Sequence, residues 1–231
     1  MSAEEPVASP VQWSVPAQAA VLVRTASARS RTLQYLLPGY LLIATGGLVT
    51  AMRVFRLVEN LRQGVRVDQT VLEAAAGRAD LVDWVSVGMF VLIGVFFLRW
   101  VHAAASAAAV LRPEPARTSP GWAVGWYFVP LFNVWKPYLA MREIEARSAR
   151  DGRDKLGALL PVWWGLWLTV SVSGFVGARM FVVASEPILI SAGALLGCVA
   201  EGLKLVLGWQ LIRLVGRIRH LQEQAVERAT G

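Results

Sequence analysis

Two charged side chains interrupt an apolar run in which charges are costly. Glu201 and Lys204 are the only charged residues between positions 187 and 209, and a charge near the centre of a bilayer costs roughly 2.5–3.5 kcal/mol on insertion scales. Residues three apart on a helix share a face, so these two can form an ion pair. Arg99 is a second candidate partner for Glu201. Such charges either relay protons or ions, or hold helices together, and we favour the second role.

The other reactive residue types are too few for a catalytic or metal site. His102 and His220 are the only histidines, and Cys198 is the only cysteine. A structural zinc site, a disulfide or a histidine-based triad needs more such residues. The sequence also lacks His-Glu-x-x-His and phosphate-binding Gly-Lys-Ser/Thr motifs. We therefore expect no catalytic residue, no metal site, no cofactor and no enzymatic activity.

The composition indicates a membrane protein. Of the 231 residues, 55% are hydrophobic and 17% are charged, whereas soluble domains are about 45–50% apolar with glycine included. The net charge of +7 comes mainly from arginines that flank the apolar runs. Because no helix-turn-helix or zinc-finger pattern occurs, we expect membrane lipids as partners and no nucleic acid.

Four apolar segments are long enough to cross a bilayer, since about 20 residues suffice. They lie within a membrane domain of residues 31–213 and cover about 32–52, 81–101, 156–183 and 187–209. Residues 1–30 are expected to form a disordered tail. Residues 214–231 form an amphipathic tail that suits either the membrane surface or a plain extension of the fourth span.

Charge counting gives an orientation for each number of spans but does not choose between the two numbers. With four spans and both termini in the cytoplasm, 16 Lys and Arg residues lie inside and 6 outside, as the positive-inside rule requires. Residues 53–80 then form an external helical hairpin in which Asp68 caps the second helix. A five-span alternative with an external amino terminus places 15 inside and 7 outside. We favour four spans in the plasma membrane.

The decision between four and five spans depends on the segment 119–149. Its uncharged part, residues 121–135, rises about 22 Å as a helix and falls short of the roughly 30 Å hydrocarbon core. Pro130 breaks that helix near its middle. Ser119 is placed to cap a first short helix, and Asn133 to cap a second. We predict a re-entrant or interfacial helical pair that turns near Pro130 and returns to the same side.

The stretches "FLRWVHAA", "SPGWAVGWYFVPLFNVWKPYLAMREI" and "VWWGLWL" resemble a bacterial membrane family catalogued as domain of unknown function 4328. The residues that carry the resemblance are Pro120, Gly121, Trp122, Trp126, Pro130, Asn133, Trp135, Pro137, Trp163 and Trp164. The family often has arginine and asparagine after the first stretch, where this chain has only small residues from 103 to 109. The resemblance implies a bacterial inner-membrane location and no established activity.

The complete pattern predicts an all-α polytopic bundle of four transmembrane helices with an inserted helical pair. Gly193 and Gly197 have the spacing of a Gly-x-x-x-Gly motif, which allows close packing within the bundle or a homo-oligomer interface. We expect a non-enzymatic scaffold or regulator that binds lipid, or another membrane or cytoplasmic protein. The alternative is a small transporter or channel that uses Glu201, Lys204 and Arg99.

Overall fold

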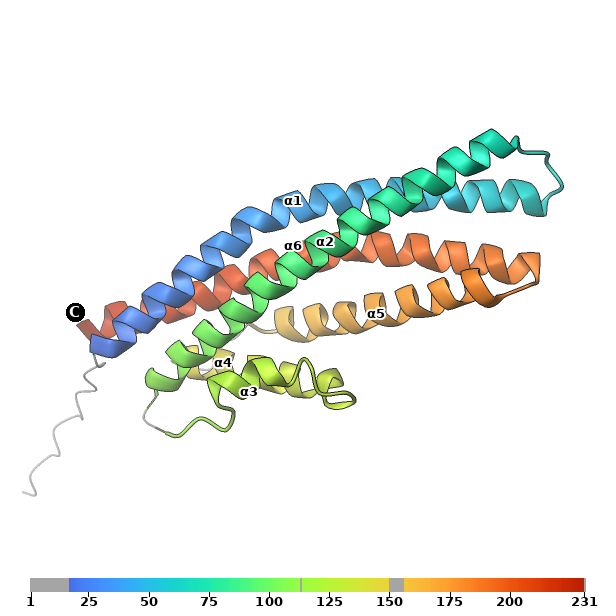
Figure 1. The fold of residues 1–231 in the computed structure, drawn as a ribbon. Coiled ribbons are helices and arrows are strands. Elements are labelled where there is room, and N and C mark those ends of the chain that lie inside the picture. The colour runs from blue at the N-terminus through green and yellow to red at the C-terminus, as the bar shows by residue number, and fades with distance from the viewer. Residues whose placement is uncertain (1–16, 113, 150–155, 231) are drawn as a thin grey trace, which may run out of the picture.

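The computed structural model describes residues 17–112, 114–149 and 156–230, and all regular secondary structure in these ranges is helical. The four long helices are α1 (Ala17–Arg62), α2 (Gln69–Val110), α5 (Leu159–Val183) and α6 (Pro187–Thr230). Each contains a stretch apolar and long enough to cross a membrane. Between α2 and α5 lie α3 (Pro120–Gly125), the short 3₁₀ helix η1 (Phe132–Val134) and α4 (Lys136–Ser148) (Figure 1). The predicted all-α class with four membrane helices is confirmed.

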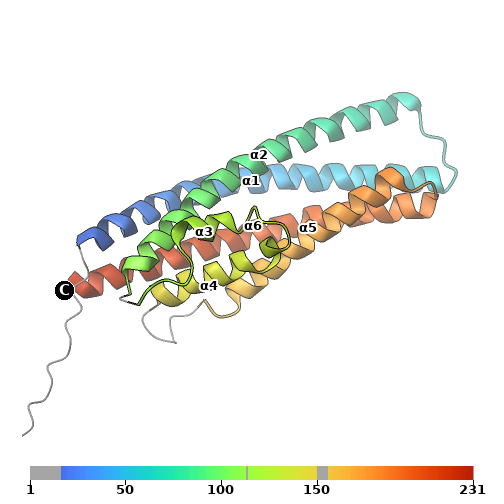
Figure 2. The same ribbon diagram turned by 60° about the horizontal axis from the view of Figure 1, so that its bottom comes forward.

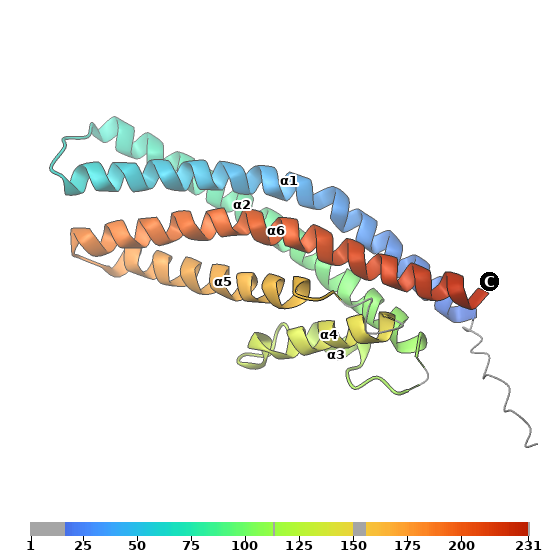
Figure 3. The ribbon, with the colours of Figure 1, turned by 180° about the vertical axis from the view of Figure 1, so that it is seen from behind.

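The long helices pack in the spatial order α2, α1, α6, α5. Helix α1 packs along both α2 and α6, and α5 packs along α6, so the first and last helices of the chain are central (Figures 1 and 3). Helix α2 has few contacts with α6. Helices α3 and α4 lie against α2, and α4 also contacts α5 and α6. The insert therefore joins the two outer helices near one end of the layer (Figure 2).

The prediction of a disordered tail over residues 1–30 is wrong for its second half, because α1 already begins at Ala17. Val23 and Ala26 are buried against Ala103 and Ala107 of α2. Small side chains on both helices allow this close packing, which a search for long apolar runs does not detect. Residues 1–16 lie outside the described part of the chain.

The connection between α1 and α2 has the predicted hairpin form. Gly64 adopts a left-handed conformation with φ of 78°, and the Val65 N–H donates to the Asn60 carbonyl at 3.0 Å, which ends α1 as a glycine C-cap does. The Asp68 carboxylate accepts from the Thr70 backbone N–H at 2.8 Å. Asp68 is therefore the N-cap of α2, as predicted.

The buried core lies toward the end of the layer that carries the described ends of the chain. Trp100, Met141, Leu214 and Ile218 are fully buried there. The apolar face of residues 214–221 is thus covered by protein, and the carboxy-terminal segment continues α6 as a plain extension instead of lying on a membrane surface. In contrast, the membrane-crossing stretches of the four helices are only 6–17% buried within the chain, which leaves apolar side chains to contact lipid.

Helices α5 and α6 approach closely through glycines. A Cβ atom added at Gly193 would lie 2.7 Å from the Phe181 backbone nitrogen and 2.9 Å from the Gly177 carbonyl oxygen. Only glycine fits without movement of the backbone. Gly193 therefore serves packing within the chain. A Cβ at Gly197 would meet no atom within 4 Å, and a homo-oligomer that uses this face stays a prediction.

Candidate functional site

The insert begins with the predicted cap. The Ser119 hydroxyl accepts from the Trp122 N–H at 3.4 Å, and Pro120 occupies the first turn of α3. Pro is favoured there because the missing N–H would have no helical partner. The chain leaves α3 after Gly125 and forms a tip over residues 126–131. The tip points along the layer toward the end that carries the α1–α2 turn (Figures 1 and 3).

The tip reverses through a γ-turn just after Pro130. The Phe132 N–H donates to the Pro130 carbonyl at 2.8 Å, and Leu131 has φ of 67° and ψ of −49°. Positive φ is unfavourable for a bulky residue, and this turn type is rare and strained. The chain therefore reverses next to Pro130, as predicted, whereas the predicted entry of this segment into the membrane stays a prediction. The predicted cap by Asn133 is wrong, because Asn133 lies inside η1 and Trp135 precedes α4 without a side-chain cap. After the tip, backbone hydrogen bonds between nearby residues lead the chain directly into η1 and α4. No helix therefore begins just after Asn133, where its side chain could act as an N-cap.

Four aromatic rings from both arms of the insert form a continuous row, which we call the aromatic ladder. Successive centroid distances are 4.6 Å for Trp122–Trp126, 5.7 Å for Trp126–Phe132 and 5.2 Å for Phe132–Trp135. The Lys136 Nζ lies 5.1 Å from the centre of a Trp126 ring, a cation–π geometry. Trp122 is 54% exposed and Trp135 is 45% exposed. The ladder therefore joins the two arms and presents aromatic surface outward.

The paired tryptophans of α5, Trp163 and Trp164, connect the insert to the long helices. The Trp164 indole N–H donates to the Val134 carbonyl at 2.9 Å, and Trp163 is buried against Phe97 of α2 with ring centres 5.8 Å apart. A buried indole contributes much apolar contact. The Trp164 N–H has the Val134 carbonyl as its partner, whereas the buried Trp163 N–H has no hydrogen-bond partner among the described residues. Pro137, the first-turn proline of α4, is also buried. The tryptophans of the sequence motif thus divide into an exposed ladder and a buried anchor.

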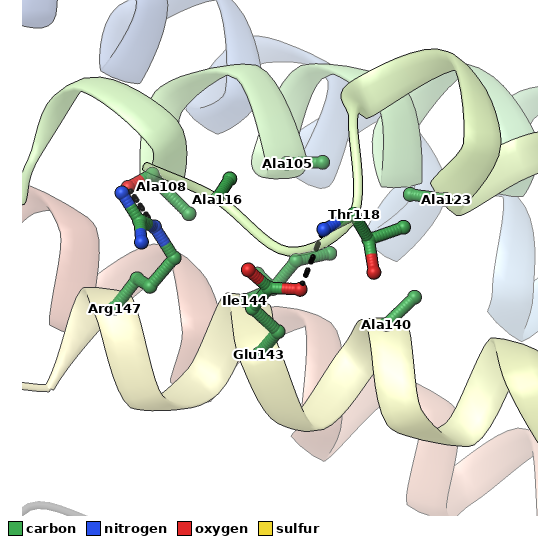
Figure 4. Close-up of a pocket in the computed structure, with 9 residues that line it drawn as sticks. All are labelled: Ala105, Ala108, Ala116, Thr118, Ala123, Ala140, Glu143, Ile144 and Arg147. Atoms are coloured by element: carbon green, nitrogen blue, oxygen red, sulfur yellow. Dashed lines mark hydrogen bonds between the residues drawn. The ribbon is translucent and has the colours of Figure 1, made fainter. Parts of the chain in front are cut away.

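A polar attachment fixes the insert to the carboxy-terminal end of α2 (Figure 4). Arg147 of α4 donates to the carbonyls of Ala108 and Ala109 at 3.1 Å, and also to those of Arg112 and Glu114. The last carbonyls of a helix lack helical partners, so a guanidinium satisfies them well. Sequence reasoning missed this role, because the contacted carbonyls lie more than 30 residues away along the chain.

Both ends of the insert lie at this same attachment. The Glu143 carboxylate accepts from the backbone N–H groups of Arg117 and Thr118 at 2.6 and 3.0 Å, just before α3. The Arg112 guanidinium donates to the carbonyl of Ala149, just after α4. The insert therefore leaves and returns at one end of the layer, as the four-span prediction requires of Ser119 and Ala149.

The intramembrane charges form a separate site between α6 and α1. The Lys204 Nζ lies 2.5 Å from the Glu201 Oε1, so Lys204 is the partner that the structure provides. The other carboxylate oxygen lies against α1, 2.9 Å from where a Cβ at Gly47 would be. Arg99 is exposed, and its carbonyl accepts from Arg29 at 2.8 Å.

Sequence reasoning missed a further member of this charged group. Asp83 of α2 lies within electrostatic range of both Glu201 and Lys204, and Tyr40 of α1 lies within range of Glu201. Asp83 stands at the edge of its predicted span, which gave no signal that it would reach α6. Within the described ranges, His, Cys, Asp and Glu side chains form no group of three that could hold a metal ion.

These features define the class: a multi-pass, all-α membrane protein with four membrane helices and an inserted aromatic hairpin that is fixed to the bundle by tryptophan and arginine contacts. The chain belongs to the family described as Domain of unknown function (DUF4328), whose match covers residues 63–220. That range includes the whole insert and the paired tryptophans, and so confirms the resemblance. No curated protein and no solved structure gave a match.

Proposed function

We propose that this protein is a non-enzymatic scaffold of the bacterial plasma membrane, with both termini in the cytoplasm, whose insert binds lipid of the cytoplasmic leaflet. The observation that carries the proposal is the aromatic ladder. Phe128 and Leu131 at the tip are 70% and 76% exposed, and the ladder continues this apolar surface along both arms. Tryptophans with one apolar and one polar end favour the membrane interface.

The polar attachment supports the same proposal. Arg147 and Glu143 hold the base of the insert through backbone groups, so its orientation relative to α2 is fixed before lipid is met. A rigid element that is already shaped for its ligand loses less entropy on binding. The buried Trp163 and Trp164 strengthen the same base. This arrangement suits a stable docking element more than a mobile gate.

The Glu201–Lys204 pair has a structural role in this proposal. Its contact with Gly47 joins α6 to α1, the central pair of the layer. The second expectation, a transporter or channel, needs these charges to line a water-filled path, whereas the contact of Glu201 with α1 supports a packing role.

The test measures the depth of the insert in a bilayer. Cys198 is replaced by serine, and a spin label is placed at Phe128 or, as a control, at Gln63 in the α1–α2 turn of the reconstituted protein. We expect oxygen to relax the label at 128 more than a water-soluble nickel complex does, with the reverse at 63. Equal access of the nickel complex to both positions would remove the basis for lipid binding by the insert.

A further inference from the structure

A groove lies between α1 and α2. It is close to their connecting turn, which stands at the end of the layer opposite the attachment of the insert (Figures 1 and 2). It encloses about 340 Å³. Arg53 and Arg56 line it from α1, and Arg78 lines it from α2. Leu57 lies four residues after Arg53 and therefore shares its face of α1. Leu57 and Val71 form an apolar wall beside the arginines.

The three arginines that line the groove have no carboxylate to balance them. Among the described residues, none of their guanidinium groups takes part in a hydrogen bond or ion pair. Glu59 is bound by Arg62 at 2.5 Å. Glu73, which accepts from Gln69 at 3.0 Å, and Asp80 keep their charge but form no ion pair with the three arginines. Three like charges around one groove, none of them in an ion pair with a described residue, repel one another and make the groove locally positive.

The groove lies at the depth of lipid phosphates. Arg53 directly follows the apolar stretch 32–52, and Arg78 lies three residues before the stretch 81–101. Arg56 is about 4.5 Å farther out along α1, at 1.5 Å per residue. The headgroup layer adds roughly 5–8 Å on each side of the hydrocarbon core. All three guanidiniums thus fall within reach of that layer, whichever side of the membrane the turn faces.

We propose that this groove binds the phosphate of an anionic phospholipid. Guanidinium groups bind phosphate oxygens through paired, charge-assisted hydrogen bonds, and three of them favour a lipid with net negative charge over a zwitterionic one. The apolar wall gives an acyl chain a path from the headgroup into the hydrocarbon core, which free phosphate would not use. This site is independent of the aromatic ladder and of the function proposed for it.

The test measures lipid affinity of the full-length protein purified in a neutral detergent. Phosphatidylglycerol, phosphatidylcholine or inorganic phosphate is titrated, and bound lipid is counted by native mass spectrometry together with the melting temperature. The groove variant carries Arg53→Gln, Arg56→Gln and Arg78→Gln. A matched control carries Arg24→Gln, Arg213→Gln and Arg217→Gln, which remove the same charge from exposed positions on α1 and α6.

For the unaltered protein and the control we expect tight binding of phosphatidylglycerol and weak binding of phosphatidylcholine. Each arginine near a membrane surface contributes about fivefold to affinity, so the groove variant should bind phosphatidylglycerol about a hundredfold more weakly. Its melting temperature without lipid should equal or exceed that of the unaltered protein, because the repulsion is gone. An equal loss in the control, or full binding by the groove variant, would overturn the site. Equal stabilisation by inorganic phosphate would overturn the lipid as its occupant.

Discussion

Removal of Lys204 should destabilise the protein more than removal of the entire ion pair. In the structure the Lys204 Nζ is 2.5 Å from the Glu201 Oε1, and the two side chains are 30% and 19% exposed. The substitution Lys204→Met leaves Glu201 against Gly47 without its cation. Breaking a fully buried pair costs about 3–5 kcal/mol. Because the Glu201 side chain retains some exposure, we expect a loss of about 2–3 kcal/mol.

The double variant Glu201→Gln, Lys204→Met removes both charges of the pair and leaves only Asp83, which forms no ion pair with either residue, so it should lose about 1 kcal/mol or less. A double-mutant cycle then gives a coupling energy of about 2 kcal/mol. The free energy of unfolding is measured for the four proteins by titration with sodium dodecyl sulfate in mixed micelles. Helix content by circular dichroism reports the transition.

The Glu59–Arg62 pair is a matched control within the same chain. It has the same three-residue spacing and the same 2.5 Å separation between nitrogen and oxygen, but it lies at the end of α1, beyond the predicted span. Its coupling should be much smaller, because exposed pairs are screened by water. A coupling below about 0.5 kcal/mol for Glu201 and Lys204, or one equal to that of the control pair, would show that membrane burial does not strengthen the intramembrane pair.

Three further predictions concern packing, pH and topology. Gly193→Ala should cost about 1–3 kcal/mol through overpacking, whereas Gly197→Ala should leave the melting temperature unchanged or raised; similar losses for both would contradict the assigned packing. Hydrogen bonds from arginine and glutamine lower the pKa of Glu59 from 4.5 to about 2. Its stabilising effect should therefore be complete above pH 4.5 and decline as pH falls toward 2, and Glu59→Gln should flatten that part of a melting-temperature profile. Single cysteines at Ser119 and Ala149, in a background without Cys198, should react with an impermeant reagent from the same side of intact cells; opposite sides would establish five spans.

The positions of the membrane helices and of their local turns follow from features that the sequence displays directly. Uncharged runs of about 20 residues locate the membrane helices, and Gly64 and Asp68 mark the turn between the first two. These features can be recognised in the sequence because each depends on one segment and on whether lipid or water surrounds it. Ser119 and Pro120 similarly predict the start of α3 from local chemistry alone.

The missed features depend on contacts between distant segments. Helix α1 begins at Ala17 because small residues there pack on α2, and the partner face is more than 75 residues away. Arg147 looks like a solvated residue near the end of a helix, yet it satisfies carbonyls of α2. Asp83 lies near Glu201 and Lys204 only because α2 and α6 are placed close together in the folded protein. Hydrophobic periodicity carries no information on such pairings.

The central place of α1 and α6 in the layer has a consequence for biogenesis. Helix α1 leaves the ribosome well before its main partner α6, so during synthesis α1 and α2 form a hairpin whose α6-facing side stays uncovered. The α1 residues that contact α6, among them Gln34, Leu41 and Gly47, have no partner surface until α6 is inserted. Loss of α6 would therefore leave α1 and α2 as a hairpin whose partner surface is missing.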